Sequence, residues 1–295
     1  MLNPPTAKRV SSPLVRLTAI ILALSTAAAS PALASPWAGN WVSYNPGSTP
    51  VFGYTNPATA LGLPERFTGE NEFGGLYQSA VTMFNPVFGT DEAVSIGEGG
   101  HLTLALDTPA TDDAGHLYGV DLILFGNSFF SDSNYPNGQQ EATASLFSAG
   151  QGRIELSADG VNFIAVPGWT ADRLFPTQGY LDVDANSTTP GGVPADFLKP
   201  MNPSLTLADF NGLSYAQSLA LYDGSGGGTP IDISLVGLSS VTHVRISVDD
   251  DFNPNTSLAA EIDAVAAVPE PTSLSILLVA CMAMTLRRSR PSCRG

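Results

Sequence analysis

The chain has 295 residues and carries 27 acidic residues against 12 basic ones, a formal net charge of −15. This acidity argues against a nucleic-acid partner, because binding to phosphate backbones requires clustered cations. A hydrophobic share of 43% argues against a wholly disordered chain, and the length allows one large domain or two small ones.

The charges are distributed unevenly along the chain. Basic residues concentrate at both ends, whereas no acidic residue precedes Glu65 or follows Glu270. Residues 35–268 hold 26 acidic against five basic residues, a net charge of −21. We interpret the two ends as targeting segments and the middle as the working domain. A domain this acidic is unsuited to anionic lipid, and it would need divalent cations to bridge it to an acidic polysaccharide.

Residues 1–34 have the pattern of a signal peptide. Basic residues precede a 13-residue apolar stretch, 17–29, and the small residues Ala32 and Ala34 stand where a signal peptidase reads the chain. We expect export through the Sec translocon and cleavage after Ala34. The alternative is an N-terminal membrane anchor, but the apolar stretch is short for a span of about 20 residues.

Residues 268–295 form a second targeting segment. A proline-flanked glutamate precedes the apolar run 274–286, and a cluster of arginines follows. This order predicts a rigid linker, a short membrane helix and a basic stop on the cytoplasmic side. The alternatives are an ordinary tail anchor and a buried C-terminal helix, and the second would not need the arginines. The predicted motif residues are Pro269, Glu270, Pro271, Arg287, Arg288 and Arg290.

This tail resembles the PEP-CTERM sorting signal of bacterial exported proteins. The resemblance implies that an exosortase-like membrane protease reads and cleaves it after a transient membrane association. It also implies a location at the outer surface or in the extracellular matrix, near extracellular polysaccharide and biofilm. Both cysteines, Cys281 and Cys293, lie in this tail, so the middle segment can hold neither a disulfide nor a cysteine-based zinc site.

The middle segment, residues 35–267, has the pattern of a single all-β domain. Short apolar runs alternate with turn residues, and helical periodicity is scarce. Asp159–Gly160 predicts a hairpin turn, residues 215–222 predict the one helix, and 128–152, 170–203 and 223–230 predict long loops. The expected strands are 94–96, 102–106, 120–125, 153–156, 163–166, 241–248 and 262–267.

The motifs of this domain look like those of a group of bacterial cell-surface proteins. That group is similar to the galactose-binding, discoidin-like jelly roll, so the resemblance implies a jelly-roll β-sandwich. The group usually has an acidic residue where Gly126 stands, and an aromatic residue and an aspartate where Ala260 and Glu261 stand. The motifs that carry the resemblance are 97–104, 121–127, 155–163, 232–246 and 261–265.

The residues needed for common catalytic machinery are scarce. The three histidines His101, His116 and His243 stand in no two-histidine metal motif, and no Gly-x-Ser-x-Gly elbow occurs. We therefore expect a protein that is not an enzyme. A glycosidase needs only two carboxylates, and that alternative stays open.

The acidic residues suit calcium, which prefers six to eight oxygen ligands. A dense run of acids and amides spans 249–255, and the jelly-roll resemblance allows a structural calcium that joins an early strand to the last one. The alternative is that these side chains are solvated acids or turn formers. The predicted ligands are Asp121, Asn127, Asp249, Asp251, Glu261 and Asp263.

Sugar binding would need exposed aromatic rings beside polar groups. Tyr135 and Trp169 lie in or next to the long loops and are the predicted ligand-binding residues, with core packing as the alternative. We therefore expect a non-enzymatic exported surface or matrix protein associated with polysaccharide. A calcium-dependent carbohydrate-binding module is the alternative, and a carbohydrate-active enzyme is a third.

Overall fold

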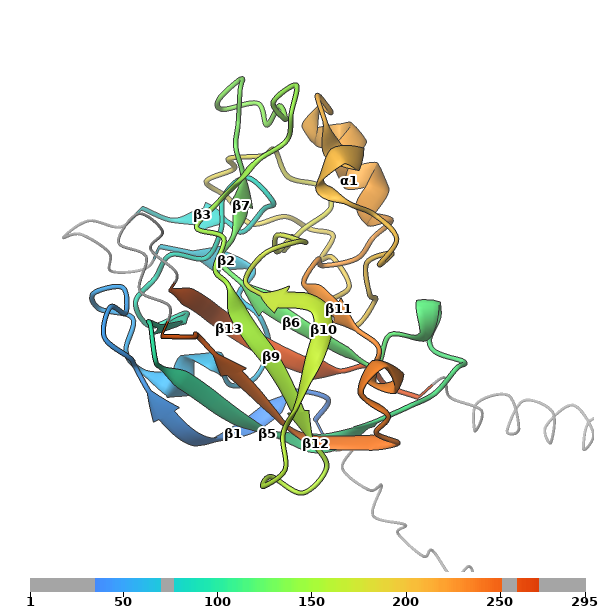
Figure 1. Ribbon diagram of the computed structural model, residues 1–295. Coiled ribbons are helices and arrows are strands. Elements are labelled where there is room, and N and C mark those ends of the chain that lie inside the picture. The colour runs from blue at the N-terminus through green and yellow to red at the C-terminus, as the bar shows by residue number, and fades with distance from the viewer. Residues whose placement is uncertain (1–34, 70–76, 251–258, 271–295) are drawn as a thin grey trace, which may run out of the picture. The chain divides into compact units, whose positions relative to one another are not determined.

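The computed structural model describes residues 35–69, 77–250 and 259–270 (Figure 1). The predicted signal peptide, Asp251, Pro271, the apolar run of the tail and its arginines lie outside these ranges. Within them, no helix is both long and apolar enough to cross a membrane.

Two antiparallel sheets form a β-sandwich (Figure 1). The five-stranded sheet has the order β1 (Ala38–Asn45), β5 (His101–Thr111), β12 (Ser240–Ser247), β9 (Gly152–Ser157), β10 (Ile164–Ala171). The four-stranded sheet has the order β11 (Thr229–Ile231), β6 (Leu122–Gly126), β13 (Ala260–Ala267), β4 (Val94–Ile96). The expectation of an all-β sandwich is therefore confirmed.

Shorter elements connect these strands. Two small ribbons pair β2 (Phe67–Thr68) with β3 (Ser79–Ala80), and β7 (Phe129–Phe130) with β8 (Leu146–Phe147). The one α-helix among the described residues is α1 (Tyr215–Tyr222). Short 3₁₀ helices are η1 (Pro57–Ala60), η3 (Leu117–Gly119), η4 (Leu207–Phe210) and η5 (Ile233–Val236).

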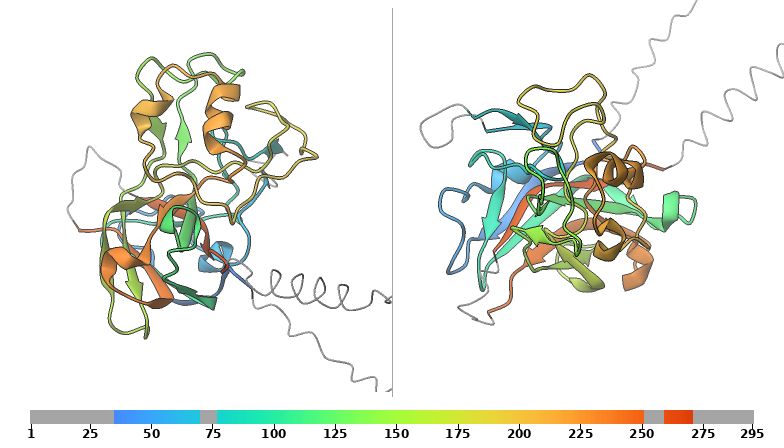
Figure 2. Two further views of the ribbon diagram at one scale, coloured as in Figure 1. Left: turned by 90° about the vertical axis from the view of Figure 1, so that its right-hand side faces the viewer. Right: turned by 90° about the horizontal axis from the view of Figure 1, so that it is seen from above.

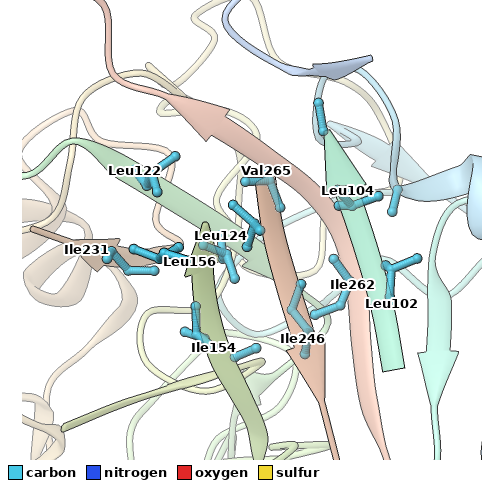
Figure 3. Packing of buried hydrophobic residues seen from close by; sticks show 14 of the residues in the cluster. Leu102, Leu104, Leu122, Leu124, Ile154, Leu156, Ile231, Ile246, Ile262 and Val265 are labelled. Carbon is cyan, nitrogen blue, oxygen red and sulfur yellow. The ribbon is translucent and has the colours of Figure 1, made fainter. Parts of the chain in front are cut away.

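The main core lies between the two sheets. Alternate residues of each strand point inward, because successive side chains in a strand face opposite sides. In β13 this alternation is broken by a bulge between Ile262 and Ala264, so that Ile262 and Val265 both face the core. Figure 3 shows Leu102, Leu104, Ile154, Leu156 and Ile246 packed against Leu122, Leu124, Ile231, Ile262 and Val265.

A second, aromatic core organises the long loops. Phe130, Phe175, Phe210 and Tyr222 are buried together, and the Tyr222 hydroxyl donates to the Pro176 carbonyl at 2.8 Å. Figures 1 and 2 show α1 and β7 together beyond one end of the sheets. The long loops therefore have a hydrophobic core of their own, formed by these buried side chains, and this core extends the folded domain beyond the two sheets.

The expected strands and the expected helix are all present, and the predicted hairpin is confirmed. β9 pairs with β10 across the connecting residues 158–163, which are longer than a two-residue turn and include Gly160 with φ of +72°. The strand β1 was not predicted, because it is an edge strand whose burial pattern is mostly exposed and does not alternate. The edge strand β11 was also missed; it holds Pro230, a residue that strands tolerate at sheet edges.

Candidate metal centre and binding pocket

Polar clusters lie at both ends of the neighbouring strands β6 and β13. Asp121 precedes β6 and Asn127 follows it, at a separation of about 20 Å along an extended chain. Because the two strands are antiparallel, Asn127 lies by the start of β13 with Glu261, whereas the Val268 amide beyond its end donates to the Asp121 carbonyl at 2.8 Å. The predicted calcium ligands therefore divide between separate places.

Asp121 is the centre of the first cluster. Its side chain is fully buried, and its Oδ1 lies 2.7 Å from His116 Nδ1. The Ile233 amide donates to Oδ2 at 3.0 Å, and the Asp113 amide donates to Oδ1 at 3.3 Å. Burial raises the pKa of Asp121, and these three hydrogen bonds oppose that rise.

His116 connects this buried aspartate to the surface. The His116 side chain is 1% exposed, and its Nε2 atom has no hydrogen-bond partner. In the tautomer whose Nδ1 donates to the Asp121 carboxylate, Nε2 is the acceptor nitrogen of the ring. Nε2 lies 3.8 Å from Glu270 Oε2.

Asp113 completes the group. One oxygen or nitrogen atom from each of Asp113, His116 and Glu270 lies within 4.8 Å of the others. A hydrogen bond with Asp113 raises the pKa of Glu270, because two carboxylates in contact need a proton or a cation between them. The carboxylates of Asp112 and Asp232 lie within the same distance of Asp121, which makes this end of the sheet strongly acidic.

The second cluster joins Asn127, Asp172 and Glu261. Asp172 Oδ1 accepts from the Asn127 and Ser128 amides, each at 2.8 Å, and Oδ2 accepts from the Glu261 amide at 3.0 Å. Asp172 itself has a left-handed backbone with φ of +59°. One buried carboxylate thus fixes the end of β6 to the beginning of β13.

Asp172 and Glu261 are two buried acidic side chains that lie close enough to influence each other's pKa. Burial raises the pKa of both, that of Glu261 to about 7, and a hydrogen bond from Asn127 opposes the rise at Glu261. Both oxygens of Asp172 already accept amide hydrogens, so a proton there would have no acceptor. We therefore place the charge on Asp172 and the proton on Glu261.

Asp172 occupies the space beside Gly126. A Cβ atom on Gly126 would lie 2.4 Å from Asp172 Oδ1 and 2.7 Å from the Glu261 carbonyl oxygen. The Asp172 carboxylate reaches this space from the residue that directly follows β10. Gly126 is thus required by the position of Asp172.

A cavity of about 590 Å³ opens at this second cluster. Asn127 and Glu261 contribute polar groups, and Asn127 Oδ1 has no hydrogen-bond partner. Apolar and aromatic side chains form most of the wall, a composition typical of small-molecule sites. The lining residues are Val51, Tyr54, Pro86, Val87, Phe88, Asn127, Phe129, Ser148, Ala149, Ala259 and Glu261.

The remaining predicted ligands lie apart from both clusters. Asp263 is fully buried and accepts from the Glu65 amide at 3.1 Å, and burial raises its pKa. Asp249 is exposed and pairs with Arg153 at 2.8 Å. Tyr135 is 76% exposed and lines another cavity, of about 500 Å³. Trp169 is partly buried against the main core.

Sequence reasoning passed over three residues of these clusters. His116 and Asp113 stand beside Asp112, and this local density of acids around a histidine is a signal in the sequence. Asp172 gives no such signal, because its partners come from distant strands. Comparison with protein-family models and with curated proteins gave no match to this chain.

Proposed function

We propose that the chain is a non-enzymatic surface or extracellular-matrix protein of a bacterial envelope. It is exported by the Sec translocon and signal peptidase, and an exosortase-like protease then sorts it through the C-terminal tail. The observation that supports this proposal is the position of Glu270, which follows the last strand by three residues and has a side chain 55% exposed.

The end of the sandwich suits such processing. β13 pairs with β4 on one side and with β6 on the other, and its last residue is Ala267. Pro269, two residues after the strand ends, fixes its own φ and favours an extended conformation at Val268. A cut near the motif would therefore remove the tail while it leaves every core strand paired.

A carbohydrate-binding module is the second candidate, and the cavity at Glu261 is the observation that favours it. Tyr54, Phe88 and Phe129 contribute aromatic rings, and Asn127 offers an amide for hydrogen bonds. Asn127 Oδ1 and Glu261 would supply oxygen ligands if a calcium ion displaced the Glu261 proton and joined a sugar there. This cavity is the site we propose for polysaccharide contact.

Intact-mass measurement of the protein recovered from the cell surface tests the sorting proposal. We expect a chain that begins at residue 35 and ends near residues 269–271. In Glu270→Ala the tail should be retained, whereas Glu141→Ala, a change at another exposed glutamate, should leave processing unchanged. A wild-type surface protein that still carries residues 287–290 would contradict the proposal.

A glycan array tests the second candidate. We expect binding that a calcium chelator weakens and that Phe129→Ala abolishes, with Phe147→Ala as the matched control. Phe147 stacks on Phe129 with ring centroids 5.5 Å apart but does not line the cavity. Binding that survives Phe129→Ala would place the sugar elsewhere.

A further inference from the structure

The strongest unexplained feature is His116 Nε2, a buried ring nitrogen without a hydrogen-bond partner. A buried polar atom without a partner loses its hydration and gains nothing in return, so such atoms are rare in folded proteins. Nε2 is nevertheless directed at two carboxylates, those of Asp113 and Glu270. A bound cation would give this nitrogen a partner and would relieve the repulsion between the carboxylates.

We propose that His116 Nε2, Asp113 and Glu270 form a three-ligand site for a zinc-class transition-metal ion. A metal ion in this site would connect Glu270, the glutamate of the C-terminal motif, to Asp113 and His116 of the β-sandwich. A fourth position is open to water, as in other zinc sites with three protein ligands.

The support behind His116 is typical of a metal-binding imidazole. Metal-ligating histidines donate the second ring hydrogen to a carboxylate or carbonyl, which fixes the ring orientation and raises its basicity. Asp121 fills this role at 2.7 Å, and the Ile233 amide in turn holds Asp121. This buried chain of contacts orients Nε2 toward the surface.

The spacing of the ligand atoms fits the proposed ion. A tetrahedral zinc with bonds of about 2.0–2.2 Å places its ligand atoms about 3.3 Å apart. Nε2 and Glu270 Oε2 are 3.8 Å apart, and all three ligand atoms lie within 4.8 Å, so small side-chain rotations close the site. An imidazole ligand favours zinc-class ions over calcium, which prefers oxygen.

Occupancy would alter the exposure of the motif. Glu270 stands between Pro269 and Pro271, so a metal bond to its carboxylate would hold this segment against the loop of Asp113. This consequence rests on the proposed sorting function, whereas the metal site itself does not.

Metal titration of the full chain in detergent tests the site. The protein is first stripped with chelator, and a Cys281→Ser, Cys293→Ser background removes the tail thiols as competing ligands. Calorimetry with zinc should then show one ion bound per chain. Glu270→Gln, Asp113→Asn and His116→Gln should each weaken zinc binding at least about 100-fold, and Asp121→Asn should weaken it about 10- to 100-fold while leaving one site.

Two controls make the result specific. His243→Gln changes a half-buried histidine on β12, and Glu141→Gln changes an exposed glutamate; both should leave the affinity unchanged. If His116→Gln fails to fold, the exposed Glu270 still provides the decisive variant. Absent zinc binding, binding that survives Glu270→Gln and Asp113→Asn, or displacement of zinc by equimolar calcium would each overturn the proposal. Because the titration needs no protease, its failure is distinguishable from failure of the sorting proposal.

Discussion

His116 Nδ1 and Asp121 Oδ1 lie 2.7 Å apart in a part of the domain that water hardly reaches. The loop after β5 provides the histidine, and the residue before β6 provides the aspartate. Because η5 also donates to Asp121 through the Ile233 amide, one carboxylate joins three segments that are distant in the chain. The contact thus has a structural role that does not depend on any ligand.

Asp121→Asn should lower the free energy of unfolding by about 2–3 kcal/mol. The NH₂ group of the new asparagine would face a hydrogen-bond donor that the carboxylate oxygen now accepts from, so that both donors would be buried without an acceptor. Denaturant unfolding with chelator present measures this loss. Asp232→Asn is the matched control: Asp232 caps η5 at the half-exposed surface through the Ser234 amide, so its loss should cost less than about 1 kcal/mol. Equal losses would contradict the role given to Asp121.

Gly126→Ala should destabilise the domain by about 1–3 kcal/mol, because the new methyl group would overlap Asp172 Oδ1 and the Glu261 carbonyl. Gly192→Ala is the control, since its nearest neighbour is the end of the Asp182 side chain at 3.3 Å, and a change within about 0.5 kcal/mol is expected. Thermal unfolding of both variants measures the difference. An unchanged melting temperature for Gly126→Ala would show that Asp172 can move away at no cost.

Sequence patterns predicted the sandwich strands well because burial gives either an alternating pattern, as in part of β5, or a continuous apolar run, as in β6. Leu102 and Leu104 illustrate this pattern in β5. The edge strands β1 and β11 lack it, since one has an exposed face and the other contains a proline. These local patterns do not show which strands become neighbours in a sheet, and so they do not show which strand ends lie together.

The site residues were predictable only in part for that reason. Asn127 and Glu261 were both selected as oxygen donors, and the antiparallel pairing of β6 and β13 brings them together. Asp121 was selected with them, but it lies at the other end of β6. Its partner His116 reaches it through a turn, and Glu270 reaches the same place through the end of β13, so neither pairing follows from spacing along the chain.

Arg245→Lys should cost about 1–2 kcal/mol. The guanidinium donates to both oxygens of Glu155, at 2.8 and 2.7 Å, and lies 4.1 Å from the centre of the Phe163 ring. Lysine cannot reproduce this two-bond geometry or the stacking. Urea unfolding of the variant measures the loss, and Arg153→Lys, a change at a more exposed arginine, should cost less than about 0.5 kcal/mol.

The same ion pair sets a direction for acid sensitivity. Hydrogen bonds from Arg245 lower the pKa of Glu155 below the ordinary value of 4.5. This contribution to stability is therefore complete above that pH and is lost as the pH falls through the lowered pKa. Below pH 4.5 the free energy of unfolding should fall less in Arg245→Lys than in the wild type. An identical pH dependence of that free energy in both proteins would contradict the pairing of Arg245 with Glu155.

Glu261 should produce a pH dependence of the opposite sign, in a separate range. Its pKa is about 7 in the folded chain, against an ordinary value of 4.5. Between these values the folded chain keeps a proton that the unfolded chain releases, so the free energy of unfolding must fall as the pH rises. At about 1.36 kcal/mol per pKa unit, the loss approaches 3 kcal/mol by pH 7.

Comparison with Glu261→Gln isolates this contribution, because other buried acids titrate in both proteins. Unfolding in chelator should show a stability that falls less steeply from pH 4.5 to 7 in the variant than in the wild type. Glu141→Gln, at an exposed glutamate, should keep the wild-type slope. Parallel curves for Glu261→Gln and the wild type would mean that Asp172, and not Glu261, carries a proton in the folded chain. In that case the three amide donors around Asp172 would not be sufficient to hold its charge.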